Sequence, residues 1–239
     1  MARHSHWHNI QLTKGKADAK KAQTFSKFAK AITVAAKDGG TDPNFNFKLR
    51  MAVDAAKAVS MPKDNIDRAI ERATGGEGCD QLKEVVYEGY GPGGIALIVT
   101  CVTDNSTRTV AEVKNTLSRH GGNMGASGSV MWMFDKKGMI TIPTKEIKDR
   151  DAVELAVIDG GAQDLRTVND RLEVVCEVKD LAAVVKVVEG LGIKPDRSGI
   201  EYLAKDPLAA DASVRDALDT LIEALEENND VEAVYTNEF

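Results

Sequence analysis

Basic and aromatic side chains are interleaved near the amino end of the chain, and they are the residues best suited to chemistry. Arg3, His4 and Trp7 precede a series of closely spaced lysines. Cations bind phosphate oxygens and aromatic rings stack on bases, so this mixture favours a nucleic-acid contact. The candidate nucleic-acid-binding residues are Arg3, His4, Trp7, Lys14, Lys16, Lys20, Lys21, Lys27 and Lys30.

The spacing from Lys16 to Lys37 predicts a helix with two different faces. With about 100° of rotation per residue, an apolar stripe forms one face and the lysines gather opposite it, apart from Lys21 near the apolar edge. Asp18 is the only acid between Arg3 and Lys37, whereas a solvated helix usually mixes signs to form i,i+4 pairs. A one-signed face favours a polyanion, and a solvated lysine-rich surface is the alternative. The apolar stripe consists of Phe25, Phe28, Ala29, Ile32, Ala35 and Ala36.

The net charge of −6 conceals an asymmetry between the two ends of the chain. Residues 1–75 carry 14 Lys and Arg against 7 Asp and Glu, while the remaining 164 residues carry 17 against 30. A basic segment on an acidic body is typical of a nucleic-acid contact. The segment 205–239, with 10 acidic and 2 basic groups, is a candidate surface for a basic protein partner.

A second basic stretch lies within the acidic part. The run Thr103-Asp104-Asn105-Ser106 supplies natural helix caps and predicts a helix over 109–117. Secondary candidates for nucleic-acid contact on this helix are Arg108, Lys114 and Arg119.

Two glycine-rich segments invite comparison with ligand-binding loops. Gly89–Gly94 matches no phosphate-loop pattern and is followed by a strand, so a hairpin is the better interpretation. Gly121–Ser129 is a long loop whose backbone amides can bind an anion. An enzyme or small-ligand protein that uses these loops is a rival hypothesis, and it predicts a pocket with converging titratable groups.

Catalytic and metal-binding patterns are absent from the sequence. There is no GxSxG motif. His120 is the only histidine beyond the basic arm that precedes Lys16, and it stands directly before a Gly-Gly helix stop. His4, His6 and His8 alternate, but no nearby carboxylate or cysteine completes a metal site. We therefore expect no enzymatic activity, no cofactor and no metal.

The composition predicts a soluble, cytoplasmic protein without membrane contact. Hydrophobic residues make up 43% and charged residues 28% of the chain, the proportions of a globular protein. No apolar run approaches the roughly 18 residues of a membrane span, and the polar start lacks the apolar core of a secretory signal. Cys79, Cys101 and Cys176 are too few for a disulfide framework and form no CxxC pair.

The order of predicted elements favours an α+β fold, in which an amino-terminal helical bundle precedes two ferredoxin-like α/β units, the second inserted in the first. Strands alternate with helices in a β-α-β-β-α-β order over 139–203, and the flanking segments close the other unit. That other unit includes strands expected at 85–87, 95–102, 130–134 and 231–235. The predicted domains are 1–78, then 79–137 with 206–239, and the inserted 138–205.

The sequence resembles the YebC/PmpR family over essentially its whole length. The most specific match is Tyr87–Gly94, which reads Tyr-Glu-Gly-Tyr-Gly-Pro-Gly-Gly. The chain departs from the family pattern at His6, His8, Gln11–Leu12 and Phe47, which weakens the basic arm. Other matching residues are Ala2, His4, Ser5, Trp7, Asn9, Ile10, Lys14, Asp18–Lys20, Phe25, Met61–Asp64, Ile66, Arg68–Ile70, Thr103–Asn105, Arg108, Thr109, Gly121–Asn123, Gly128–Val130, Trp132 and Phe134.

The resemblance implies three domains and no established enzymatic activity. Bacterial members of the family are described as DNA-binding transcriptional regulators. Mitochondrial relatives look like translational activators for cytochrome oxidase subunit I, and some bacterial relatives are implicated in translation at the ribosome. Both roles need a surface that binds a polyanion.

Together these observations predict a non-enzymatic nucleic-acid-binding regulator of gene expression, a DNA-binding transcriptional regulator of the YebC/PmpR type. The alternative is a translation factor or translational activator associated with ribosomal or messenger RNA. No helix-turn-helix with a polar reading helix is recognisable, which favours RNA or backbone-only binding. A scaffold that binds a basic protein through the acidic α/β surface is a further hypothesis.

Overall fold

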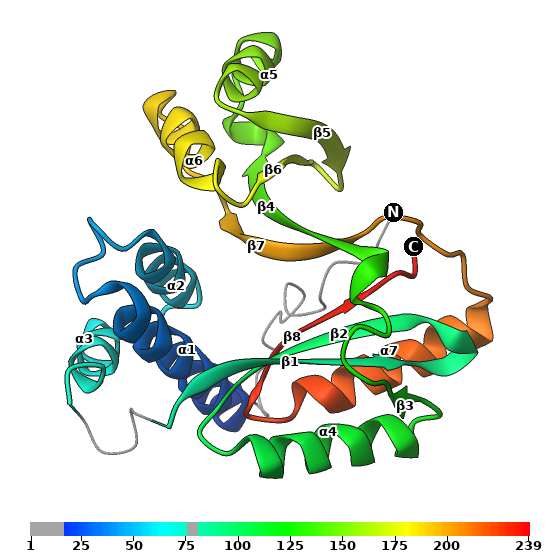
Figure 1. The fold of residues 1–239 in the computed structure, drawn as a ribbon. Coiled ribbons are helices and arrows are strands. Elements are labelled where there is room, and N and C mark those ends of the chain that lie inside the picture. Colours follow the sequence, from blue (N-terminus) through cyan, green and yellow to red (C-terminus); the bar gives the residue numbers. More distant parts are fainter. Residues whose placement is uncertain (1–16, 76–80) are drawn as a thin grey trace. The chain divides into compact units, whose positions relative to one another are not determined.

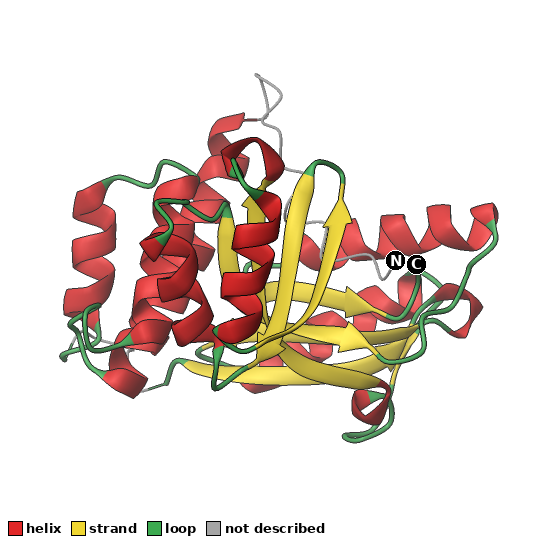
Figure 2. Ribbon diagram, turned by 90° about the horizontal axis from the view of Figure 1, so that it is seen from above, coloured by secondary structure: helices red, strands yellow, loops and turns green. Residues whose placement is uncertain are grey.

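The structure is a computed structural model, and it describes residues 17–75 and 81–239. It is an α+β protein with an amino-terminal helical region followed by two antiparallel sheets with their helices, as the element order predicts (Figures 1 and 2). The chain forms two compact units: the first ends at Phe134 and resumes at Ala204, and the second comprises Asp135–Leu203. None of the described helices is long and apolar enough to cross a membrane.

Three helices, α1 (Ala17–Gly39), α2 (Phe47–Ala58) and α3 (Lys63–Arg72), pack on one another at the start of the first unit (Figure 1). Asn46 joins the first two, because its Oδ1 caps α2 at the Leu49 N–H while its Nδ2 donates to carbonyls of Ala35 and Gly40. The apolar face of α1 lies in the shared core, as predicted. The buried residues of this core are Phe28, Ile32, Ala35, Ala36, Leu49, Val53, Ala56, Met61, Ile66 and Ala69.

The first unit also contains a four-stranded antiparallel sheet with the order β3-β1-β2-β8. Side chains alternate along a strand, so Leu97, Val99 and Cys101 share one face of the sheet. The helices α4 and α7 cover that face and close a core with these residues (Figure 1). The elements are β1 (Lys83–Tyr90), β2 (Ala96–Thr103), α4 (Ser106–Arg119), β3 (Asn123–Met124), α7 (Ala212–Glu226) and β8 (Val231–Thr236).

Gly89–Gly94 forms the hairpin between β1 and β2, as predicted, with a single 3-10 turn at Pro92–Gly94. Gly93 has a φ of 69°, in the left-handed region, and a Cβ at this position would lie 2.7 Å from Val214 of α7. Close packing against α7 therefore accounts for this glycine without a bound phosphate.

The second unit has the ferredoxin-like order β-α-β-β-α-β, and its strands are arranged β5-β6-β4-β7. Asn169 and Asp170 both have positive φ and make the tight turn between β5 and β6. The elements are β4 (Phe134–Pro143), α5 (Arg150–Asp159), β5 (Ala162–Val168), β6 (Arg171–Glu177), α6 (Leu181–Gly190) and β7 (Arg197–Ala204).

Residues 130–134 do not form the short strand that the sequence predicts. Met131–Met133 is a 3-10 turn, and β4 runs unbroken from Phe134 through Gly138 to Pro143. The Glu88 carboxylate accepts hydrogen bonds from the N–H groups of Val130 and Met131, so these donors are unavailable to a strand ladder. Gly138 pairs with Cys176 in the ladder between β4 and β6, and α6 packs directly on its backbone: a Cβ there would lie 2.9 Å from the Cβ of Leu181.

Candidate nucleic-acid interface

The exposed basic residues at the amino-terminal end of α1 are Lys20 and Lys21. The Lys21 ammonium lies 5.6 Å from the centre of the Phe25 ring, which keeps it at the surface over an aromatic face. This end of α1 follows directly on the basic arm in the sequence. Five of the predicted binding residues lie outside the described residues, namely Arg3, His4, Trp7, Lys14 and Lys16.

The lysine face of α1 is only partly open, which differs from the two-faced helix predicted from the sequence. Lys27 is 8% exposed, and its Nζ donates to the Glu226 carbonyl at 2.5 Å. Gln23 Nε2 donates to the Glu227 carbonyl at 2.5 Å, and Lys30 Nζ donates to the Asn229 carbonyl at 3.2 Å. We call this set of contacts, from Gln23, Lys27 and Lys30 to residues 226–230, the corner contact.

The corner contact has a simple electrostatic basis. The last carbonyls of a helix lack partners within the helix and carry its negative dipole end. Glu226 and Glu227 stand at this end of α7, and cationic side chains commonly satisfy such carbonyls. Lys27 and Gln23 of α1 therefore act as a carboxyl-terminal cap for α7, supplied from a distant part of the chain.

The Asp230 carboxylate pairs with candidate binding residues from both predicted basic surfaces, on α1 and on α4. It is 4% exposed, and its carboxylate pairs with Lys30 Nζ at 2.6 Å and with Arg108 at 2.7 Å. The hydroxyls of Thr103 and Thr109 also donate to it. Burial alone would raise the pKa of Asp230, but these donors outweigh it and hold the pKa well below its usual range. Asp230 is thus a charged junction of α1, β2, α4 and the α7–β8 turn.

Burial has the opposite effect on Lys27. Desolvation lowers its pKa to about 8, although the negative charge of Glu226 partly offsets this. The ammonium form is therefore held in a place that disfavours its charge.

The sequence contained a signal for the corner contact that hydrophobic periodicity does not use. Gln23, Lys27 and Lys30 follow each other at helical spacing, and the segment 226–230 holds three acids in five residues. Matching a one-signed helix face to an acidic helix end elsewhere in the chain would have suggested the pairing.

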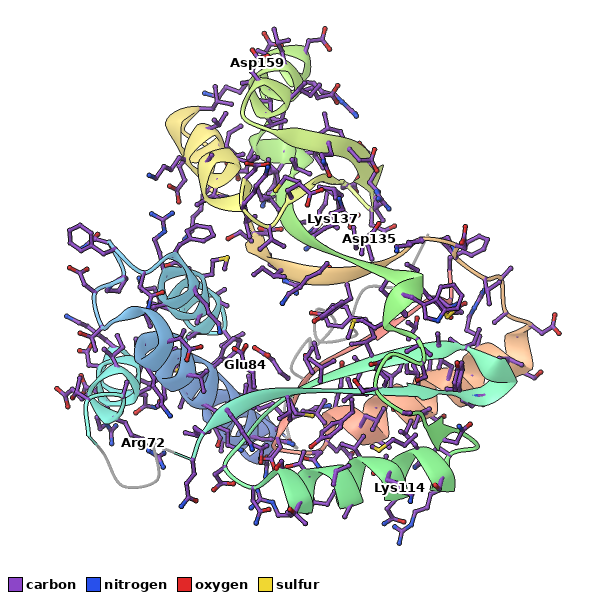
Figure 3. The ribbon with its side chains drawn as sticks, viewed as in Figure 1. Arg72, Glu84, Lys114, Asp135, Lys137 and Asp159 are labelled. Carbon is purple, nitrogen blue, oxygen red and sulfur yellow. The ribbon has the colours of Figure 1, made fainter. Side chains whose placement is uncertain are left out.

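The three secondary candidates on α4 have different environments. Arg108 is engaged by Asp104 at 2.9 Å as well as by Asp230. Lys114 and Arg119 are exposed, and Figure 3 labels Lys114 on α4. Lys114 and Arg119 are therefore open to solvent, whereas Arg108 holds the Asp230 junction together.

The Gly128 amide of the second glycine-rich loop and the two amides that follow the loop, at Val130 and Met131, bind a carboxylate of the chain itself. Glu88, which is 7% exposed, accepts from the N–H groups of Gly128, Val130 and Met131 at 2.6–2.8 Å. Burial alone would raise the pKa of Glu88, but the three backbone donors outweigh it and lower the pKa. These amides are therefore occupied.

Two surface hollows in the described part of the chain have no lining residue from either glycine segment. One of about 460 Å³ is lined by Lys83, Tyr87 and Ser106 among others, and one of about 660 Å³ by Lys145, Arg171 and Asp196 among others. No group of three or more His, Cys, Asp and Glu suited to a metal occurs among the described residues. The buried thiols of Cys101 and Cys176 have pKa values raised by burial to about 12 and about 11, so neither is a ready nucleophile.

Comparisons with known proteins cover nearly the whole chain. Residues 5–76 match the TACO1/YebC protein N-terminal domain, and residues 82–238 match the TACO1/YebC second and third domain. A probable transcriptional regulatory protein of Thermoanaerobacter pseudethanolicus is 44% identical over 99% of this chain and 96% of its own length. One from Herpetosiphon aurantiacus is 45% identical over 99% of this chain and 94% of its own.

A solved structure agrees with the sequence comparisons. The crystal structure of a conserved hypothetical protein from Aquifex aeolicus superposes with a TM-score of 0.86 at 37% identity, covering 98% of this chain and 97% of that one. Sequence matches along both units and a shared fold lead to one conclusion. The chain belongs to the TACO1/YebC family, and both of these bacterial relatives are named probable transcriptional regulatory proteins.

Proposed function

We propose that the chain is a non-enzymatic, nucleic-acid-binding regulator of gene expression, that its basic amino-terminal region holds the phosphates, and that its partner is DNA. The charge asymmetry carries this proposal: residues 1–75 hold 14 Lys and Arg against 7 Asp and Glu, while the rest of the chain is acidic. Phosphate contacts from lysines supply affinity that depends strongly on salt and weakly on sequence. The names of the relatives support a role in transcription.

The open cations define where the phosphates would lie. Lys20 and Lys21 on α1 are exposed, and the arm residues Arg3, Lys14 and Lys16 precede them in the sequence. The acidic remainder of the chain repels phosphate and so confines a nucleic acid to the basic region. Its acidic surface is left for a basic protein partner.

RNA is the second candidate partner. On the described helices α2 and α3 the exposed faces mix signs, with Asp54 3.3 Å from Lys57 and with the Arg68 guanidinium bonded to Asn65 and the Asp64 carbonyl. Such faces do not suit the reading of base edges in a DNA major groove. Binding through phosphates and shape suits an RNA equally well.

A charge reversal at the open end of α1 tests the proposal. The variant Lys20→Glu/Lys21→Glu is compared with the parent protein by fluorescence anisotropy on a DNA duplex and on a single-stranded RNA of equal length, across a salt series. If both lysines contact phosphates, the magnitude of the negative slope of log K against log salt decreases by about 1.8 on the duplex, and affinity falls at least tenfold.

The control carries the same change of charge elsewhere. Lys186 and Lys194 are exposed residues of the second unit, and Lys186→Glu/Lys194→Glu should leave the slope unchanged. Equal losses in the two variants, or no loss in either, would contradict the proposed interface. Crosslinking in cells, with DNA and RNA sequenced separately, then decides between the two partners.

A further inference from the structure

The corner contact uses the same chemical groups that a nucleic acid would need. Lys27 and Lys30 donate to carbonyl oxygens of residues 226 and 229, and Lys30 also pairs with the Asp230 carboxylate. Phosphate oxygens are acceptors of the same kind and carry more charge. In the free protein, the α7–β8 turn therefore supplies the acceptors that a polyanion would offer to this part of α1.

The two uses exclude one another. Lys27 is buried against α7, so a phosphate reaches its ammonium only after α1 has moved away from residues 226–230. Lys30 is less buried, with a side chain 22% exposed, but its Nζ already faces Asp230 at 2.6 Å. A phosphate at Lys30 must displace that carboxylate or be repelled by it.

Contacts that a nucleic acid could replace hold α1 against the α7–β8 turn in the free protein. The described contacts between the three helices and the sheet include an apolar cluster of Val34, Leu82 and Val102, the corner contact, and an exposed ion pair between Lys48 of α2 and Glu84 of β1. Burial disfavours the charge of Lys27, whereas a phosphate would favour it. Small and polar interfaces within a chain are those that open most readily.

We propose that the corner contact is autoinhibitory: residues 226–230 occupy Lys27 and Lys30 in the free protein, and nucleic-acid phosphates displace them, so that binding opens α1 from the α7–β8 turn. This inference rests on the proposed function and adds a regulatory step to it. The apparent affinity is then the intrinsic affinity reduced by the small fraction of molecules that are open.

Gln23 offers a test that changes no charge. Gln23→Ala removes one hydrogen bond of the corner contact and leaves every lysine in place. We expect it to tighten binding to the DNA duplex or RNA by about three- to tenfold, the effect of one hydrogen bond, with the salt slope unchanged because the bound state is the same. The matched control is Thr24→Ala, whose hydroxyl bonds only within α1, to the Lys20 carbonyl.

A substitution at Lys30 tests whether this lysine contacts phosphate in the complex or serves only to stabilise the fold. If Lys30 reaches a phosphate once α1 has opened, Lys30→Gln lowers the salt slope on the duplex by about 0.9. A lysine that serves only to hold the fold leaves that slope unchanged.

Hydrogen exchange on the parent protein tests the opening of the corner contact without any substitution. Amides of residues 226–231 should exchange faster in the complex saturated with duplex than in the free protein. Unchanged exchange there, together with equal affinities of Gln23→Ala and Thr24→Ala, overturns the autoinhibition while leaving nucleic-acid binding intact. If neither the parent protein nor Gln23→Ala binds either probe at any salt, the proposed function itself fails.

Discussion

At the scale of single residues, buried carboxylates organise distant segments of this chain. Glu88 on β1 holds the loop that leads into β4, and Asp230 holds α1 and α4 beside β2. A buried charge is tolerated only where donors surround it. Each of these carboxylates has at least three, which explains why both have lowered pKa values despite burial.

The contribution of Glu88 is measurable as stability. Glu88→Gln replaces one charged acceptor oxygen by a donor that faces backbone N–H groups. We expect the free energy of unfolding to fall by about 2 kcal/mol at neutral pH, since hydrogen bonds to charged groups are the stronger kind. Urea unfolding followed by circular dichroism measures this. Glu84→Gln on the same strand removes only the exposed pair with Lys48 and should cost less than about 1 kcal/mol.

The pH dependence of the same variant has a defined sign. The pKa of Glu88 lies below its ordinary value of 4.5 in the folded protein, so the ionised group stabilises the fold fully above pH 4.5. This stabilisation is lost as the pH falls from 4.5 toward the folded-state pKa. The difference in stability between the parent protein and Glu88→Gln should therefore shrink below pH 4.5, and a constant difference would contradict the assignment.

At the scale of elements, close approach between backbones decides where glycines stand. A Cβ on Gly122 would lie 2.5 Å from the Tyr90 carbonyl oxygen, and one on Gly89 would lie 2.7 Å from the Asn123 carbonyl oxygen. These two positions let β3 approach β1, with which it pairs. Gly89 and Gly122 thus have a packing role, and for the segment that contains Gly122 the sequence had left anion binding open.

Gly122 supplies a test of that packing role. Gly122→Ala must push apart two backbone segments that cannot yield as a side chain would, and we expect the protein to lose about 2 kcal/mol or more of stability. Gly190, at the end of α6, has open space around its Cα and an ordinary φ. Gly190→Ala should be neutral or slightly stabilising, so thermal melts of the two variants ought to move apart.

At the scale of the whole molecule, the second unit is inserted through two adjacent crossings. The Lys205 N–H donates to the Met133 carbonyl at 3.0 Å, so the outgoing and returning chains lie side by side in the first unit. Adjacent ends are what allow one unit to be inserted into another without disturbing its core.

Deletion of the insert is therefore expected to leave the first unit folded. Replacing residues 135–203 by a short Gly-Ser linker should preserve its secondary structure and cooperative melting, and under the proposed function its affinity for a DNA duplex. Circular dichroism and fluorescence anisotropy measure these properties. Loss of cooperative unfolding would mean that the first unit depends on the second for its stability.

The sequence by itself determined the elements and much of the fold class. Periodicity identified the apolar face of α1 and the β-α-β-β-α-β order, because local spacing decides which side chains share a face. The run Thr103–Ser106 was predicted to supply helix caps, and within it Asn105 Oδ1 accepts from the Arg108 N–H. These features depend on neighbours a few residues apart.

Tertiary structure alone decided which charged groups are exposed to solvent and which are paired with other parts of the chain. Lys20 and Lys27 are both on the lysine face in the sequence, yet the first is exposed and the second is buried against α7. The acceptors of Lys27 and of the loop amides lie about 200 and 40 residues away along the chain. No local pattern encodes such partners, because the free energy of a charge depends on what the fold brings beside it.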